Sequence, residues 1–196
     1  MCRLFLFVFY KKDDRIKSGD NMKIILETDR LVLREMTMDD FSSLKKVISD
    51  KETMKYYPFP YDDNGVKRWI EWCIDCYSKY GFGLWAVVLK ETGEMIGDCG
   101  VSMQLIDGKL KPEIGYHIRK DHQRKGLASE ASKAVKDYFF LKFDFNEVYS
   151  YMNKDNIASI KTALANGMKY VGEFIDKNGE VDRIYMIKRS EWKKNG

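Results

Sequence analysis

The sequence predicts a single domain of the mixed α/β class, in which helices pack on a mostly antiparallel sheet. Its 196 residues are enough for one sizeable hydrophobic core. Apolar residues recur at every second position in some segments and at helical spacing in others, with turn signals between them. The predicted order is strand, two helices, three strands, helix, strand, helix and two strands.

The first half of the chain contains the opening strand, two helices and an antiparallel meander. Residues 24–35 alternate in polarity, and Thr37 follows as a helix cap. Apolar residues at helical spacing then predict helices over residues 41–50 and 63–80. Period two follows and predicts three strands joined by tight turns, over residues 84–90, 95–103 and 110–118.

The second half alternates helices with strands. Helical spacing over residues 128–140 is followed by a strand over 147–152 and a helix over 156–166 that ends at Gly167. The dipeptide Asn178-Gly179 is a strong hairpin signal. It joins the last two predicted strands, residues 168–175 and 181–187.

An aromatic segment over residues 56–61 is interrupted by Pro58 and Pro60, which predicts a loop. Two interpretations of this loop are open. It either forms the wall of a substrate pocket or covers the core as a hydrophobic lid.

Composition narrows the classes of function. Hydrophobic residues make up 44% and charged residues 33% of the chain, as in soluble globular proteins. The net charge of +4 is small for a protein that binds nucleic acid and fits a polyanionic small ligand at least as well. The apolar segment over residues 4–10 is too short to span a membrane, and charged residues follow it where a signal-peptide cleavage site would stand. We therefore expect a cytoplasmic protein that binds neither nucleic acid nor membranes directly.

Domain boundaries follow from the same pattern. Residues 1–21 are interpreted as an N-terminal extension outside the fold, residues 22–190 as the domain, and residues 191–196 as a basic tail. The pair Cys73 and Cys76 has C-x-x-C spacing, but a zinc site would need a second ligand pair. We interpret both as apolar residues on a helix.

The segment between the strand at 110–118 and the helix at 128–140 is the clearest candidate binding site. Gly126 and the small Ala128 let the backbone turn tightly and approach a ligand, while the first amides of the helix lack intrahelical partners. The helix start and the nearby Arg124 and Lys125 favour a pyrophosphate. The spacing is neither that of G-x-G-x-x-G nor that of a P-loop.

This segment resembles the Q/R-x-x-G-x-G/A motif of the GNAT superfamily of N-acetyltransferases, whose amides hold the pyrophosphate of coenzyme A. Other stretches resemble the ribosomal-protein-alanine and -serine N-acetyltransferase branch: residues 27–34, 113–116, 128–131, 156–159 and 166–168. The resemblance covers residues 22–190. It implies a GNAT fold, with helices on both faces of the sheet and two splayed central parallel strands, 110–118 and 147–152.

The resemblance also implies acetyl-CoA as co-substrate, without a metal. Backbone groups of Tyr116, His117 and Ile118 would pair with the pantetheine arm like an added strand. Asn156 resembles the residue that hydrogen-bonds the arm. The pyrophosphate would be held by amides of Arg124, Lys125, Gly126, Leu127, Ala128 and Ser129.

Acetyl transfer to an amine needs a base for the amine and a proton for the leaving thiolate, because a lysine-like amine has a pKa of about 10.4. Glu113 is the leading candidate for the base, with a purely structural carboxylate as the alternative. Many family members protonate the thiolate with a tyrosine, but that position is Ala163 here. Ser159, one helical turn after Asn156, resembles a serine of this branch and is the candidate acid.

Other reactive side chains are interpreted as structural. Glu130 lies in the first turn of a helix, where a carboxylate complements the helix dipole. His117 and His122 are possible bases, but we interpret both as non-catalytic, because exposed histidines are usually not catalytic. Cys99 is interpreted as a core residue.

The sequence therefore predicts an enzyme that transfers acetyl from acetyl-CoA to a primary amine by direct attack. The branch suggests a protein N-terminus, such as that of a ribosomal protein. Small amines such as polyamines or antibiotics, a non-catalytic acyl-CoA-binding module and an RNA-binding protein are alternatives. A homodimer is a further expectation.

Overall fold

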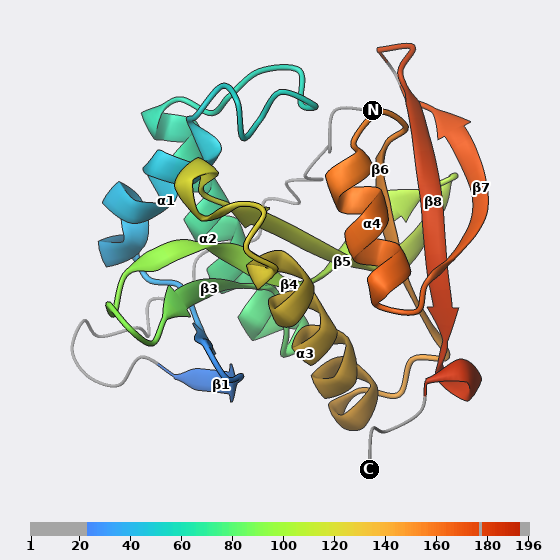
Figure 1. Ribbon diagram of the computed structural model, residues 1–196, viewed down its shortest axis with the longest axis horizontal. Helices are drawn as coiled ribbons and strands as arrows, with labels where there is room; N and C mark the ends of the chain where they lie inside the picture. The colour runs from blue at the N-terminus through green and yellow to red at the C-terminus, as the bar shows by residue number, and fades with distance from the viewer. Residues whose placement is uncertain (1–22, 177, 193–196) are drawn as a thin grey trace.

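The computed structural model describes residues 23–176 and 178–192. Within these residues, eight strands form one sheet in the order β1-β2-β3-β4-β5-β6-β8-β7 (Figure 1). Neighbouring strands are antiparallel except for β5 and β6, which are parallel. The strands are β1 (Ile24–Glu27), β2 (Leu31–Arg34), β3 (Leu84–Leu89), β4 (Met95–Ile106), β5 (Lys109–Ile118), β6 (Glu147–Asn153), β7 (Lys169–Ile175) and β8 (Val181–Lys188). The predicted mixed α/β class and GNAT-like sheet are confirmed.

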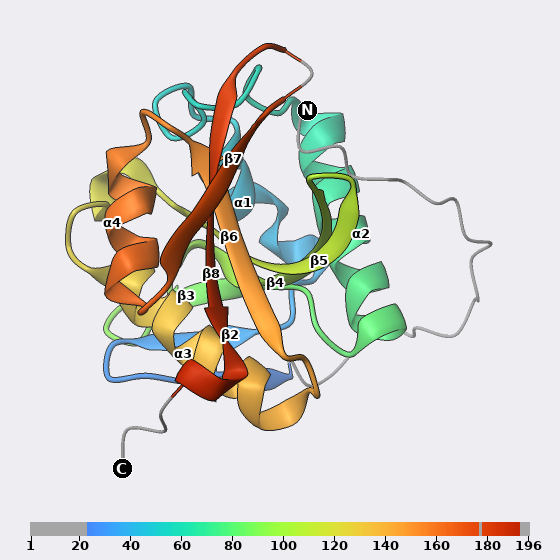
Figure 2. The same ribbon diagram turned by 90° about the vertical axis from the view of Figure 1, so that its right-hand side faces the viewer.

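Helices cover both faces of the sheet, as expected (Figure 2). The described α-helices are α1 (Phe41–Ile48), α2 (Asp63–Tyr80), α3 (Leu127–Lys142) and α4 (Ile157–Ala165). Short 3-10 turns precede α1 and α3 and follow β8, over Met38–Asp40, Lys120–His122 and Arg189–Glu191. None of the described helices is long and apolar enough to cross a membrane.

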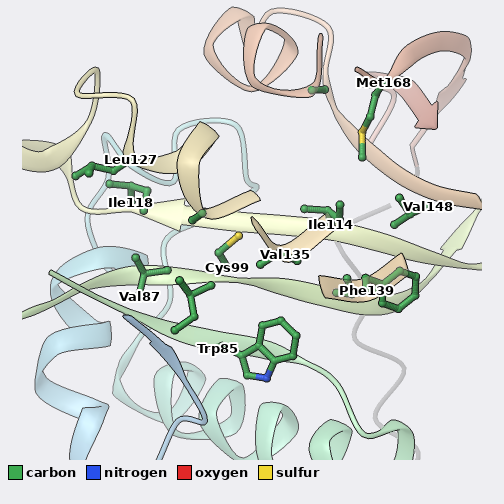
Figure 3. Close-up of a cluster of buried hydrophobic side chains, with 14 of the residues drawn as sticks. Trp85, Val87, Cys99, Ile114, Ile118, Leu127, Val135, Phe139, Val148 and Met168 are labelled. Atoms are coloured by element: carbon green, nitrogen blue, oxygen red, sulfur yellow. The ribbon is translucent and has the colours of Figure 1, made fainter. Parts of the chain in front are cut away.

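The alternation of side chains along β3 explains the two layers. Leu84 and Ala86 face α1 and α2, whereas Trp85 and Val87 face α3. The larger core lies on the α3 side, where Val135 and Phe139 of the helix pack over the sheet (Figure 3). Figure 3 also shows Val148 of β6 and Met168 beside this core, which therefore joins the two halves of the sheet.

The prediction of one strand over residues 24–35 is wrong. The segment forms a hairpin, in which the amide of Thr28 donates to the carbonyl of Leu31 at 2.9 Å. The turn is fixed from outside, because the Thr28 hydroxyl and the Arg30 amide both bond the carboxylate of Glu130 on α3. Strand periodicity cannot predict this turn, because the contact that fixes it involves a residue 100 positions further along the chain.

The interpretation of the α2 cysteines as core residues is confirmed, since Cys73 and Cys76 are both buried. Cys99 on β4 is buried as well, as expected. Burial raises the pKa of the Cys76 thiol to about 12, which removes its reactive thiolate at neutral pH. The predicted N-terminal extension and most of the predicted tail lie outside the described residues.

Candidate active site

A cavity of about 1030 Å³ opens where β5 and β6 diverge. This volume matches the upper end of small-ligand sites. Its walls come from the carboxyl ends of β5 and β6, the β5–α3 loop, the start of α4, the α1–α2 loop and the β7–β8 hairpin. All the segments implicated by the sequence therefore meet at one place, although they are widely separated along the chain.

The divergence of β5 and β6 is visible in their hydrogen bonding. Their ladder has a single paired position, Glu113 with Tyr149. One residue further on, the Ser150 hydroxyl donates to the carbonyl of Ile114 at 3.0 Å, so a side chain replaces the ladder there. Both strands then line the cavity, with Tyr116, His117 and Ile118 on the β5 wall. The cavity therefore lies between two neighbouring strands of one sheet.

Two backbone groups on this wall already have partners. The amide of His117 donates to Asp98 at 3.0 Å, and the carbonyl of Ile118 accepts from the Gln123 side chain at 2.8 Å. The second bond also ties the end of β5 to the loop that follows. Pairing of this wall with a ligand therefore depends on the remaining backbone groups.

The β5–α3 loop has the geometry of an anion site. Arg124 and Gly126 have positive φ angles of 60° and 78°, which turn the chain sharply before α3. Helix α3 begins at Leu127 without a capping side chain on its first amides. These amides form a positive concavity at the cavity wall. Five of the six predicted amide donors line the cavity: Arg124, Gly126, Leu127, Ala128 and Ser129.

Lys125 is the exception, and its placement reveals how the loop is held. Its carbonyl accepts a hydrogen bond from Arg30 at 3.0 Å, and Lys125 is not among the residues that line the cavity. The same Arg30 side chain bonds Glu130 at 2.6 Å. Arg30 therefore links the β1–β2 turn, the loop and the first turn of α3, a positioning role that the sequence analysis missed.

Glu130 has the structural role that the sequence predicts. Burial raises the pKa of its carboxyl group, but hydrogen bonds from Thr28 and Arg30 outweigh burial and leave the pKa below its ordinary value. Glu130 is therefore ionised at neutral pH. It fastens α3 to the β1–β2 turn and contributes a favourable charge at the helix start.

The start of α4 forms the opposite wall. Asn156 caps this helix, because its side-chain oxygen accepts from the Ser159 amide at 3.2 Å. The cap uses only the oxygen, so the side-chain nitrogen can donate to a ligand. Ser159 also lines the cavity, and its carbonyl accepts from the Tyr116 hydroxyl at 3.1 Å across the gap. Ala163 is buried in the core beneath this helix.

The α1–α2 loop forms both a wall of the cavity and a lid over the core, the two alternatives that the sequence left open. Tyr56, Tyr57 and Pro58 line the cavity, and the Tyr56 hydroxyl donates to the carbonyl of Asp155 at 2.9 Å. Tyr61, in contrast, packs edge-on against Trp69 in the second core. The first part of the loop is thus a cavity wall and the last part a core lid.

A buried polar chain runs from the sheet to the cavity. The Nδ1 atom of His117 lies 2.7 Å from Asp98, and its Nε2 atom lies 2.6 Å from the hydroxyl of Tyr57. Trp69 donates to the second oxygen of Asp98 at 2.9 Å. The histidine is only 5% exposed, so the premise that it is an exposed histidine is wrong.

This arrangement was missed, although the sequence contained a signal for half of it. The β4–β5 turn at Asp107 and Gly108 fixes the hairpin register. Counting outward from that turn places Asp98 directly opposite His117, as the structure shows. Tyr57, which comes from a loop between two helices, has no comparable signal.

The leading candidate base lies apart from this group. Glu113 is 1% exposed on β5, paired with Ser102 and Tyr149, and is not among the residues that line the cavity. His122 does line the cavity and lies 2.8 Å from Asp121. The catalytic role of Glu113 stays a prediction, and it requires a path from a buried carboxylate to the cavity.

Comparisons with known proteins agree with this geometry. Residues 30–169 match the family model described as an acetyltransferase (GNAT) domain. The uncharacterized protein YkkB of Bacillus subtilis is 35% identical over 151 residues, which are 76% of this chain and 88% of that protein. The uncharacterized N-acetyltransferase p20 of Bacillus licheniformis is 35% identical over 170 residues, 83% of this chain and 93% of that protein.

Solved structures share the fold. A ribosomal L7/L12 alpha-N-protein acetyltransferase, RimL, in complex with coenzyme A superposes with a TM-score of 0.70 at 18% identity, covering 85% of this chain and 98% of that one. At this identity the likeness concerns the fold alone. The family match and the two relatives, together with the loop at the diverging strands, lead to one conclusion: the chain belongs to the GNAT acetyltransferase family, whose members transfer an acetyl group to an amine.

Proposed function

We propose that this protein binds acetyl-CoA in the cavity and transfers its acetyl group directly to a primary amine. The observation that supports this most strongly is the junction of an uncapped helix start with two diverging strands in one cavity. The helix start suits a pyrophosphate, and the strand gap suits an extended arm that is attached to it.

The residues present fit this co-substrate. Gly126 has a φ of 78°, a backbone conformation that residues with a side chain rarely adopt, so the loop requires glycine at this position. The amides of residues 124–129 would hold the pyrophosphate, and the Asn156 nitrogen and backbone groups of residues 116–118 would hold the arm. Bound acetyl-CoA supplies the thioester that the amine attacks.

Ser159 is the proposed proton donor to the leaving sulfur. It lines the cavity beside Asn156, where its hydroxyl can reach a ligand that enters between the strands. A strong acid is not needed to protonate the leaving thiolate, because a thiol has a pKa near 8.5. Glu113 remains the base predicted from the sequence, and water would have to carry the proton to it.

The proposed acceptor is a protein N-terminus. The support is the shared fold with RimL, whose name specifies an alpha-N-protein acetyltransferase. A small polyamine is a second candidate, because five carboxylates line the same cavity. They are Glu52, Asp155, Asp176, Glu180 and Asp182. Negative charge around the acceptor would attract a cationic amine.

The test measures release of free thiol from acetyl-CoA with three acceptors: a short peptide with a free N-terminus, its N-formylated counterpart and spermidine. Mass spectrometry identifies the acetylated product. Turnover of the free peptide but not the blocked one supports the N-terminal acceptor, and turnover of spermidine supports the second candidate. Binding of acetyl-CoA without thiol release from any of these would favour a non-catalytic acyl-CoA-binding module.

A further inference from the structure

The buried chain from Asp98 through His117 to Tyr57 has no part in the function proposed so far. Burying a carboxylate and an imidazole inside a sheet is costly unless every polar atom is paired. Here the chain leads from a carboxylate with 0% exposure to a tyrosine in the cavity wall. It thus connects the solvent-excluded sheet with the cavity.

The hydrogen bonds determine which group donates and which accepts along this series of side chains. Asp98 accepts from the His117 amide and from Trp69, and a carboxylate cannot donate. The Nδ1 atom facing Asp98 must therefore bear the hydrogen. In the neutral imidazole this leaves Nε2 as an acceptor, so the Tyr57 hydroxyl donates to it. A phenol oxygen that donates its hydrogen can also accept one, so the Tyr57 oxygen is a suitable acceptor for a donor that enters the cavity.

We propose that Tyr57 is the catalytic residue that takes the proton from the acceptor amine, with His117 and Asp98 acting through it as positioning residues. This inference rests on the proposed function and deepens it. An N–H bond of the ammonium group breaks as an O–H bond forms at Tyr57. The original Tyr57 proton moves to Nε2 of His117, and the neutral amine is left to attack.

The proton balance closes without a further reactant. His117 becomes an imidazolium beside the Asp98 carboxylate, which stabilises that charge. It returns the proton to solvent after transfer, while Tyr57 ends as a phenol. The second proton of the amine nitrogen is released when the amide forms and accounts for the proton taken up by the sulfur.

The direction of this relay distinguishes Tyr57 from the tyrosine that many family members use as an acid. An acid must point its hydrogen at the leaving sulfur, whereas the Tyr57 hydrogen points at His117. The relay also starts in the cavity wall, whereas Glu113 does not line the cavity. Tyr57 and Glu113 are therefore alternatives that experiment can separate.

Other ionisable groups surround the relay. Burial raises the pKa values of the Cys73 thiol and the Tyr77 hydroxyl, both on α2, well above their ordinary values. The negative charge of Asp98 raises them further. Both groups are neutral over the range of an assay. The other ionisable groups that the α1–α2 loop, the end of β5 with the loop after it, and the β6–α4 loop contribute to the cavity wall are Glu52, Lys55, Tyr56, Tyr116, Lys120, His122, Arg124 and Asp155. Of these, His122 is the one imidazole, and its substitution serves as a control.

The first experiment compares Tyr57→Phe with Tyr61→Phe, which removes a hydroxyl from the same loop outside the cavity. We expect Tyr57→Phe to lower kcat by about 100-fold or more, with unchanged affinity for acetyl-CoA by calorimetry. The acceptor is the peptide or spermidine, whichever wild type acetylates. The difference in kcat between wild type and Tyr57→Phe should become smaller as pH rises, because a larger fraction of the amine is already neutral. His122→Gln should leave this trend in place.

Unchanged kcat in Tyr57→Phe, with acetyl-CoA bound as in wild type, would overturn the relay. So would a loss of equal size at every pH, which would indicate a structural role. If Glu113→Gln instead showed the loss and the recovery at high pH, Glu113 would be the base. Absence of acetyl-CoA binding in wild type would contradict the proposed function itself, and the two failures are therefore distinguishable.

The second experiment needs no acceptor. The chain has only two histidines, so ¹⁵N labelling of histidine gives few imidazole signals, and His117→Gln identifies those of His117. We expect protonated Nδ1 and bare Nε2 in wild type. Asp98→Asn should move the hydrogen to Nε2, because an amide can donate to Nδ1. A hydrogen on Nε2 in wild type would overturn the relay, whatever the activity.

Discussion

The two sides of the cavity are built in different ways. The side proposed to bind the co-substrate consists mainly of backbone amides from one continuous segment, in which residues 123, 124 and 126–129 line the cavity. The acceptor side consists of side chains that come from three separate elements, with Tyr57 in a loop, Asp98 on β4 and His117 on β5. A backbone site tolerates changes of side chain as long as the turn survives. A site built from a series of hydrogen-bonded side chains, in contrast, depends on each of them.

The difference also concerns what supports each side. The co-substrate loop is tied from outside by Arg30, which is half exposed. The acceptor side is supported from within the sheet by Asp98, which is inaccessible to solvent. Disturbing the acceptor side should therefore cost stability, whereas disturbing the co-substrate side should cost affinity.

The largest effect on stability is expected for Asp98→Ala. The change leaves the His117 amide, the His117 ring and the Trp69 indole without their acceptor. We expect the free energy of unfolding to fall by about 3 kcal/mol, because unsatisfied buried donors are expensive. Urea denaturation measures this, with the exposed Asp155→Ala as control. Equal stability of the two variants would contradict the conclusion that Asp98 supports the acceptor side from within the sheet.

A smaller effect is expected for Arg30→Met, which removes the tie to Lys125 and Glu130. Exposed ion pairs contribute at most about 1 kcal/mol, so we expect acetyl-CoA affinity to weaken about fivefold with little loss of stability. Lys90→Met is a suitable control, because it removes a surface ion pair with Glu27 in the same region. If both variants bind acetyl-CoA like wild type, Arg30 does not position the loop.

The smallest effect is expected for Ser159→Ala. Because a thiolate is a weak base, water can replace the hydroxyl, and kcat should fall by less than about tenfold. The helix cap by Asn156 uses the Ser159 amide and survives the change. Steady-state thiol release measures the rate, with the exposed Ser42→Ala as control. A loss as large as that of Tyr57→Phe would shift the main proton transfer to α4.

The contrast explains how much the sequence could predict. The β5–α3 loop is a local pattern, in which a glycine with positive φ precedes a helix, and its chemistry follows from adjacent residues. The order of helices and strands likewise follows from local periodicity. The hairpin of β1 and β2 was missed, because its turn is set by Glu130 on a distant helix.

The polar chain could be predicted only in part. The register of the β4–β5 hairpin places Asp98 opposite His117, but their burial depends on Trp69 and α2 packing over that face. The position of Tyr57 depends on how a proline-rich loop folds between two helices, and no periodicity encodes it. Sequence patterns therefore predicted the proposed co-substrate side, whereas the proposed acceptor side could be recognised only in the assembled fold.

The most direct test of the account is calorimetric titration of acetyl-CoA into wild type, Gly126→Glu and Gly93→Glu. Both variants add a carboxylate at a glycine of positive φ, 78° and 69°, and therefore share the backbone strain. Gly93 lies in the β3–β4 turn with open space around it. We expect binding by wild type and Gly93→Glu and none by Gly126→Glu, since its carboxylate would repel the pyrophosphate. Equal binding by all three, or none by folded wild type, would contradict the assignment of the co-substrate site.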